Sequence, residues 1–161
     1  MKPDWNIGYT TRNHLCLDLD NSSITKVYSL ASLLIREHPE LGDCLIVQSS
    51  HCELKQVLCH QPMKLPYHKV KRDSFHLIFN NTIPYEESCK IIETLARLDV
   101  ISEAFIRIRE MRNDMTLRVS KTVNVTHVKP PPQIVGYKIN YKVPKKGNGI
   151  GLYLALLNCL L

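Results

Sequence analysis

Between residues 14 and 121 the hydrophobic side chains repeat with two different periods, and this restricts the fold more than any other feature of the chain. Segments 24–37 and 84–98 have apolar residues at helical spacing, and residues 105–108 extend the second helix or form a third. The remaining segments are short and apolar, or alternate between apolar and polar residues, as strands do. These strand-like segments are 14–20, 44–48, 75–79 and 115–120.

The resulting element order is β-α-β-β-α-β, which predicts an α+β fold with one antiparallel sheet. This order is typical of the split βαβ, ferredoxin-like or RRM-like arrangement. We expect helices on one face of the sheet and an open second face. In such a sheet the segment 14–20 lies between segments 115–120 and 75–79, and 44–48 is at the edge.

The length of 161 residues, of which 44% are hydrophobic, is enough for one domain with its own core. We expect an N-terminal arm over 1–13, a core over 14–121, and a basic extension over 122–161. The extension contains a proline run and a short apolar helix that packs on the same domain. No window of 18 apolar residues and no secretory signal is visible, so we expect a cytoplasmic protein with no membrane contact. Its cysteines should be reduced thiols or metal ligands and not a disulfide framework.

The net charge of +6 is unevenly distributed, because no acidic residue follows Asp114. A field of one sign attracts polyanions, although the same lysines could serve solubility alone. The proline run 130–132 favours an extended backbone, which could guide a single-stranded template. The candidate nucleic-acid-binding residues are Lys138, Lys142, Lys145 and Lys146.

Strand alternation assigns side chains to the two faces of the predicted sheet. Asp18 and Asp20 are expected on the open face. Ser74 and His76 should point the same way from the third strand, and Arg118 from the fourth. The side chains expected to face the core are Leu15, Leu17, Leu19, Phe75, Leu77, Phe79, Met115, Leu117 and Val119.

Two carboxylates one pleat apart suit Mg²⁺ or Mn²⁺, which prefer oxygen ligands and bind triphosphates. His76, Arg118 and Lys121 could neutralise the phosphates by charge-assisted hydrogen bonds. The alternative is structural: Asp20 caps the following helix, and His76 is an ordinary buried residue.

These residues resemble the motifs of archaeo-eukaryotic primases and primase-polymerases. The run from Leu15 to Asp20 looks like their hhhDhD/E motif, Ser74-Phe75-His76 matches S-x-H, and 117–121 looks like their Leu-Arg-x-Ser/Pro segment. The resemblance covers about residues 14–121. It implies template-directed nucleotidyl transfer, Asp18 and Asp20 as catalytic metal ligands, and Ser74 and His76 at the phosphates of the incoming nucleotide.

The sequence departs from the family in one respect, because no third carboxylate follows S-x-H in the usual setting. Asp114 is the candidate for this third carboxylate, because strand alternation places it on the same face as Arg118. A haloacid-dehalogenase-like phosphatase would need a late acidic pair, and no acidic residue follows Lys121. A non-catalytic RRM that binds single-stranded nucleic acid would present aromatic side chains, and not polar ones, on the outward face of its sheet. A relaxase-type endonuclease would need a second histidine.

A His/Cys cluster lies in the long connection between the second and third strands. His51-Cys52 and Cys59-His60 could hold zinc tetrahedrally, although their spacing is not that of C-x-x-C sites. A polar loop is the more ordinary interpretation of this segment.

The sequence therefore predicts a small, metal-dependent primase-polymerase-like nucleotidyltransferase. Its expected ligands are nucleoside triphosphates, a single-stranded DNA template, and a helicase or another replication protein. The alternative is a non-catalytic nucleotide- or nucleic-acid-binding replication accessory module of the same fold. The small core would suit a mobile element or a virus.

Overall fold

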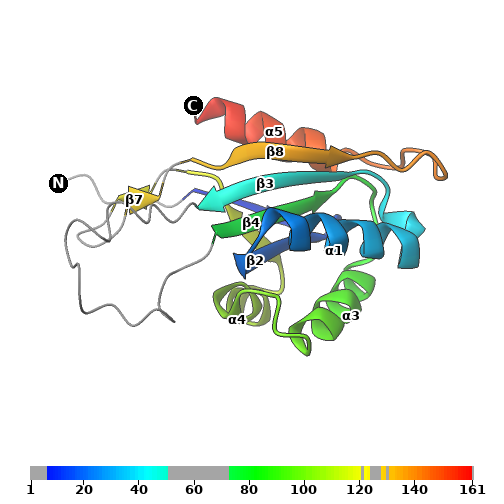
Figure 1. The fold of residues 1–161 in the computed structure, drawn as a ribbon, viewed down its shortest axis with the longest axis horizontal. Helices are drawn as coiled ribbons and strands as arrows, with labels where there is room; N and C mark the ends of the chain where they lie inside the picture. Colours follow the sequence, from blue (N-terminus) through cyan, green and yellow to red (C-terminus); the bar gives the residue numbers. More distant parts are fainter. Residues whose placement is uncertain (1–6, 51–72, 121, 124–127, 130, 161) are drawn as a thin grey trace.

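The computed structural model describes residues 7–50, 73–120, 122–123, 128–129 and 131–160 (Figure 1). These residues form an α+β fold with antiparallel sheets. The main sheet has the strand order β2 (Cys16–Ser22), β4 (Asp73–Phe79), β3 (Cys44–Ser50) and β8 (Gln133–Lys138). The other strands form two antiparallel pairs, β1 (Gly8–Thr11) with β5 (Met115–Arg118) and β6 (Thr122–Val123) with β7 (Val128–Lys129).

The helices begin and end close to the predicted positions. Ser23 caps the first helix, because its side chain accepts a hydrogen bond from the backbone N–H of Lys26. Ser102 caps the helix that begins at Glu103 in the same way, by accepting a hydrogen bond from the backbone N–H of Phe105. The helices in the described part of the chain are α1 (Ile24–Glu37), α3 (Tyr85–Ala96), α4 (Glu103–Arg112) and α5 (Gly149–Cys159), with a 3₁₀ turn η1 (Pro39–Leu41).

The predicted neighbours β2, β4 and β3 pair as expected, but the last strand of the predicted core does not join their sheet. β5 pairs with β1, inside the segment predicted to be an arm, although it also lies close to β2. The outer edge of β2 instead bonds to the residue that precedes α4, because the carbonyl oxygen of Asp18 accepts a hydrogen bond from the N–H of Ser102. The opposite edge of the sheet gains β8 from the basic extension.

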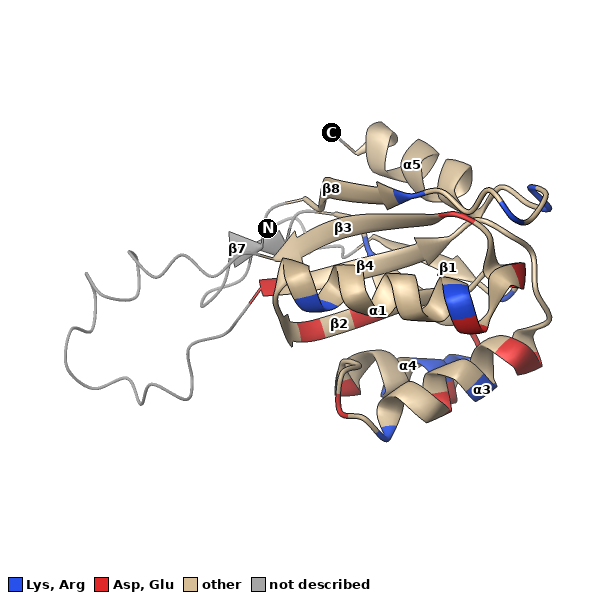
Figure 2. Ribbon diagram, turned by 45° about the vertical axis from the view of Figure 1, so that its right-hand side comes forward, with Lys and Arg blue, Asp and Glu red and all other residues tan. Residues whose placement is uncertain are grey.

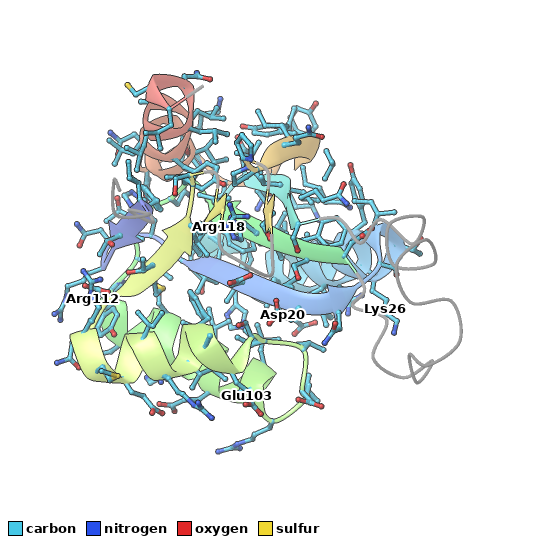
Figure 3. All side chains as sticks on the ribbon, turned by 90° about the vertical axis from the view of Figure 1, so that its left-hand side faces the viewer. Asp20, Lys26, Glu103, Arg112 and Arg118 are labelled. Carbon is cyan, nitrogen blue, oxygen red and sulfur yellow. The ribbon has the colours of Figure 1, made fainter. Side chains whose placement is uncertain are left out.

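The core residues predicted from strand parity are buried, each with 2% or less of its surface exposed. The prediction of one open face is wrong. α1 covers one face of the main sheet, and α5 lies on the other with the β1–β5 pair (Figures 1 and 3). The physical reason is that the second face also carries apolar side chains, which favour cover from water. These are Cys16, Leu45, Val47 and Ile78, all buried.

The C-terminal helix packs on the same body as the core, because Ile150, Tyr153 and Leu157 are buried in the common hydrophobic cluster. Among the described residues, no helix is both long enough and apolar enough to cross a membrane.

The turn before β3 requires glycine, and this gives a test of the fold. Gly42 has φ of 75°, and a Cβ there would lie 2.5 Å from the Asn81 side chain. We expect Gly42→Ala to lower the free energy of unfolding by more than about 1 kcal/mol, from strain and the clash together. Gly151 in α5 has no atom within 4 Å of such a Cβ.

Gly151→Ala is the matched control. It should leave the free energy of unfolding unchanged or raise it by up to about 1 kcal/mol, because alanine favours the helix. Urea denaturation of both variants measures the difference. Equal effects of the two substitutions would contradict the turn geometry.

Candidate functional site

Antiparallel pairing of β2 with β4 places Asp18 directly opposite His76. Residues opposite each other in such a ladder share a face of the sheet, and the two side chains meet. Oδ1 of Asp18 lies 3.8 Å from Nε2 of His76. The Asp18 side chain keeps 26% of its surface exposed, whereas that of His76 keeps only 2%. Strand parity alone predicted that these two residues share a face.

The second nitrogen of His76 is held by α5. Its Nδ1 lies 3.2 Å from the hydroxyl of Tyr153, and the two rings meet edge to face. Tyr153 in turn packs edge to face on Tyr9 of β1. The imidazole therefore lies under α5, and not on an open surface facing a nucleotide as the sequence suggested.

Asp20 lies near the end of β2, where the strand becomes exposed (Figure 3). Its Oδ1 accepts a hydrogen bond of 3.0 Å from Ser74, the residue one pleat before His76. Asn21 then adopts a left-handed φ of 52°, and the ladder becomes irregular between Leu19 and Ser22. Asp20 is not the cap of α1, because Ser23 takes that role.

Arg118 reaches across from β5 into the main sheet. Its guanidinium donates hydrogen bonds to the backbone carbonyl oxygens of Ser49 and Ser120. Burial lowers the pKa of Arg118, and the nearby charge of Asp18 opposes that shift. β5 lies close to β2 without pairing with it as a strand, and the charge of Asp18 acts on the Arg118 guanidinium.

Asp114, the candidate third carboxylate, lies at the start of β5. Its Oδ1 accepts a hydrogen bond from Thr116, and Nε of Arg112 is 3.7 Å from its Oδ2. Within the described ranges, no group of three or more His, Cys, Asp or Glu side chains is placed to hold a metal ion. Asp114 therefore does not complete a three-carboxylate set with Asp18 and Asp20.

Sequence reasoning did not identify Tyr153 as a neighbour of the site. The detectable signal was the apolar character of the supposedly open face, which requires a cover, together with a tyrosine inside an apolar helix. Burial raises the pKa of the Tyr153 hydroxyl, with Cys16 as the next cause. Burial also raises the pKa of Cys16, so both groups stay protonated and uncharged near Asp18.

The four candidate lysines lie away from Asp18. Lys138 pairs with Cys44 at the start of β3, and its ammonium group contacts Ser32 and the Tyr28 ring on the α1 side. Lys142, Lys145 and Lys146 follow in the loop before α5, at the opposite end of the sheet from Asp20 (Figures 1 and 2). These four lysines therefore do not adjoin the aspartates of β2.

Some predicted site residues lie outside the described part of the chain. These are the four candidate zinc ligands His51, Cys52, Cys59 and His60, and the candidate phosphate ligand Lys121.

Comparison of the chain with protein-family models, with curated proteins and with solved structures gives no match. The arguments about its function therefore depend on the residues themselves.

The contact between His76 and α5 can be tested by removing one hydroxyl. We expect Tyr153→Phe to lower the free energy of unfolding by about 1–3 kcal/mol, because a buried imidazole nitrogen loses a hydrogen bond. Tyr9→Phe is the control, since the Tyr9 hydroxyl donates a long bond of 3.4 Å to the carbonyl oxygen of Gly149 and does not contact His76. It should cost about 0.5 kcal/mol. Equal losses in urea denaturation would show that the Tyr153–His76 bond is unimportant.

Proposed function

We propose that the protein is a small nucleotidyltransferase of the primase-polymerase kind, with an RRM-like core formed around β2, β4 and β3. It acts on nucleoside triphosphates and a single-stranded DNA template. One observation carries the proposal: on the antiparallel strands β2 and β4, Asp18 contacts His76 and Asp20 contacts Ser74. Two short motifs, more than fifty residues apart, meet pair by pair.

The two aspartates suit a divalent cation bound together with a nucleotide. Mg²⁺ is commonly held by one or two carboxylates plus substrate phosphates, and keeps several waters. Asp18 and Asp20 are both accessible, so two carboxylates without a third protein ligand fit this mode of binding. When bound, Mg²⁺ or Mn²⁺ would stabilise the charge of the reacting phosphates.

The other residues would orient the aspartates and the phosphates. His76 is fixed by Tyr153 and contacts Asp18, so it would hold the Asp18 carboxylate in position and not contact the nucleotide directly. Ser74 does the same for Asp20 through its hydroxyl. Arg118 extends from β5 toward the end of β3, where the carbonyl oxygens of Ser49 and Ser120 hold its guanidinium, and it would supply positive charge beside the bound phosphates.

A second candidate function is a nucleotide-binding replication accessory module of the same fold, working with a helicase or another replication protein without synthesis. The position of Asp114 favours it, because Arg112 and Thr116 engage that carboxylate at the start of β5. A site with two carboxylates can bind a metal–nucleotide complex and still lack the group needed for transfer.

Nucleotide binding tests the proposed site. A fluorescent nucleoside triphosphate should bind in the presence of Mn²⁺ and bind much more weakly in its absence. We expect Asp18→Asn with Asp20→Asn to reduce the affinity at least about tenfold, because two oxygen ligands lose their charge.

The matched control for nucleotide binding is Glu93→Gln with Asp99→Asn, which removes the same charge from an exposed surface at α3. It should bind as the wild type does. If both double variants bind equally, the aspartates of β2 are not the nucleotide site.

Synthesis distinguishes the two candidate functions. With a single-stranded template, Mn²⁺ and labelled nucleotides, the wild-type protein should form labelled products and the Asp18→Asn variant none. Divalent-dependent nucleotide binding with no product under any of these conditions would reject the transferase and favour the accessory module.

A further inference from the structure

The loop between β8 and α5 combines positive charge with tyrosines. From Tyr137 to Lys146 the chain reads YKINYKVPKK, with two tyrosines, four lysines and no acidic residue. Lys138 and Lys145 have partners, namely Ser32 and the buried Asp43 at 4.0 Å. Lys142 and Lys146 are exposed, and Tyr141 keeps 89% of its surface exposed.

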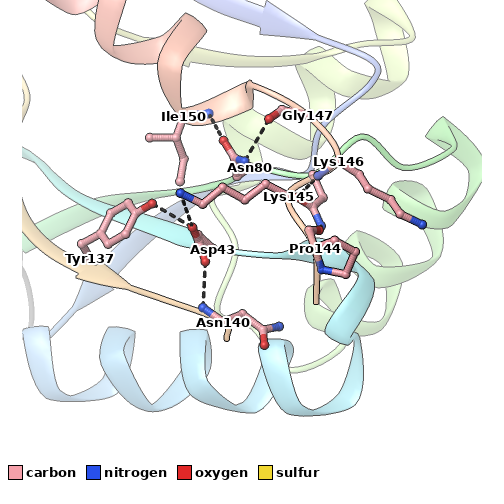
Figure 4. Close-up of polar contacts among 10 residues, drawn as sticks. Asp43, Asn80, Tyr137, Asn140, Pro144, Lys145, Lys146, Gly147 and Ile150 are labelled. Atoms are coloured by element: carbon pink, nitrogen blue, oxygen red, sulfur yellow. Dashed lines mark hydrogen bonds and ion pairs between the residues drawn. The ribbon is translucent and has the colours of Figure 1, made fainter. Parts of the chain in front are cut away.

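A polar network around the buried Asp43 and Asn81 side chains ties this loop to the turn before β3 and to the end of β4 (Figure 4). The Asp43 carboxylate accepts hydrogen bonds from the backbone N–H of Asn140 at 2.7 Å and from the Tyr137 hydroxyl at 3.0 Å. At the far end of the loop, the Asn81 side chain accepts from the N–H of Lys146 and donates to the carbonyl oxygen of Pro144.

The network fixes the backbone on both sides of Tyr141 while its ring stays in water. A ligand that binds there needs to order less of the chain, which favours affinity. The exposed Tyr141 ring therefore does not contribute to packing in this structure. Flanked by lysines, it has the composition of surfaces that bind single-stranded nucleic acids, where bases stack on aromatic rings and phosphates meet cations.

We propose that the loop 139–147 is a binding surface for single-stranded nucleic acid, on which a base stacks on Tyr141 and phosphates meet Lys142 and Lys146. Lys142 and Lys146 are exposed, and the acidic side chain that contacts the loop, Asp43, is buried, which gives the charge complementarity. The surface begins where β8 ends, at the opposite end of the sheet from Asp20. It is therefore separate from the proposed nucleotide site and can exist without it.

Fluorescence anisotropy with a labelled oligothymidine, over a series of salt concentrations, tests this proposal. Tyr141→Ala should weaken binding about tenfold, the effect of losing one stacked base. Tyr141→Phe keeps the ring and should bind as the wild type does. Lys142→Gln with Lys146→Gln should reduce the slope of log affinity against log salt by about 1.4, for two phosphate contacts on a single strand.

Lys26→Gln with Lys90→Gln is the matched control, because these lysines are exposed on α1 and α3, away from the loop, and the change in net charge is the same. It should leave the slope unchanged. An equal loss of slope in the two lysine pairs would overturn the proposal, since net charge alone would then explain binding. Wild-type affinity in Tyr141→Ala would overturn it as well, because no base would stack there.

The Asp18→Asn with Asp20→Asn variant separates this proposal from the proposed function. It should bind the oligothymidine as the wild type does, even if it no longer binds nucleotide. If that variant loses oligothymidine binding while the loop variants keep it, the strand binds at the aspartates, and the loop is not the surface.

Discussion

The antiparallel pairing of β2 with β4 is the constraint on which the rest of the candidate site depends. It sets Asp18 opposite His76 and leaves Asp20 within hydrogen-bond reach of Ser74. A shift of one residue in this register would turn every side chain of β2 to the other face, so that Leu17 and Leu19 would leave the core. Burial of the leucines therefore fixes the position of the aspartates.

The elements packed on the second face of the main sheet determine how much of this site is exposed to water. α5 and the β1–β5 pair bury Cys16 and His76, so Asp18 lies at the margin of a packed interface rather than on an open sheet. The same helix is connected to β8 by the anchored basic loop. The buried Asp43 and Asn81 hold that loop, and Gly42 approaches Asn81 closely at the turn before β3. One tightly packed corner thus determines where the lysines lie.

Much of this arrangement could be predicted from the sequence because strand alternation is a local signal. The period of two residues was enough to place Asp18 with His76 and to identify the core leucines. The contact with Tyr153 could not be predicted in the same way, since it joins residues 77 positions apart and depends on how α5 packs. The pairing of β5 with β1 was missed because Gly8–Thr11 is short and has no clear alternation. The location of the lysines could not be predicted either. It depends on the pairing of β8 with β3, and no hydrophobic period in the sequence indicated that pairing.

NMR with Mn²⁺ is the sharpest test of our proposal that the β2 aspartates hold a divalent cation together with a nucleotide. Amide signals close to a bound Mn²⁺ ion broaden first in a titration with nucleotide present. We expect early broadening for residues 18–20 and for Ser74, while signals of α3 stay sharp and the Asp18→Asn with Asp20→Asn variant shows no selective broadening. Broadening that begins elsewhere in the protein, or that is the same in the variant, would contradict it.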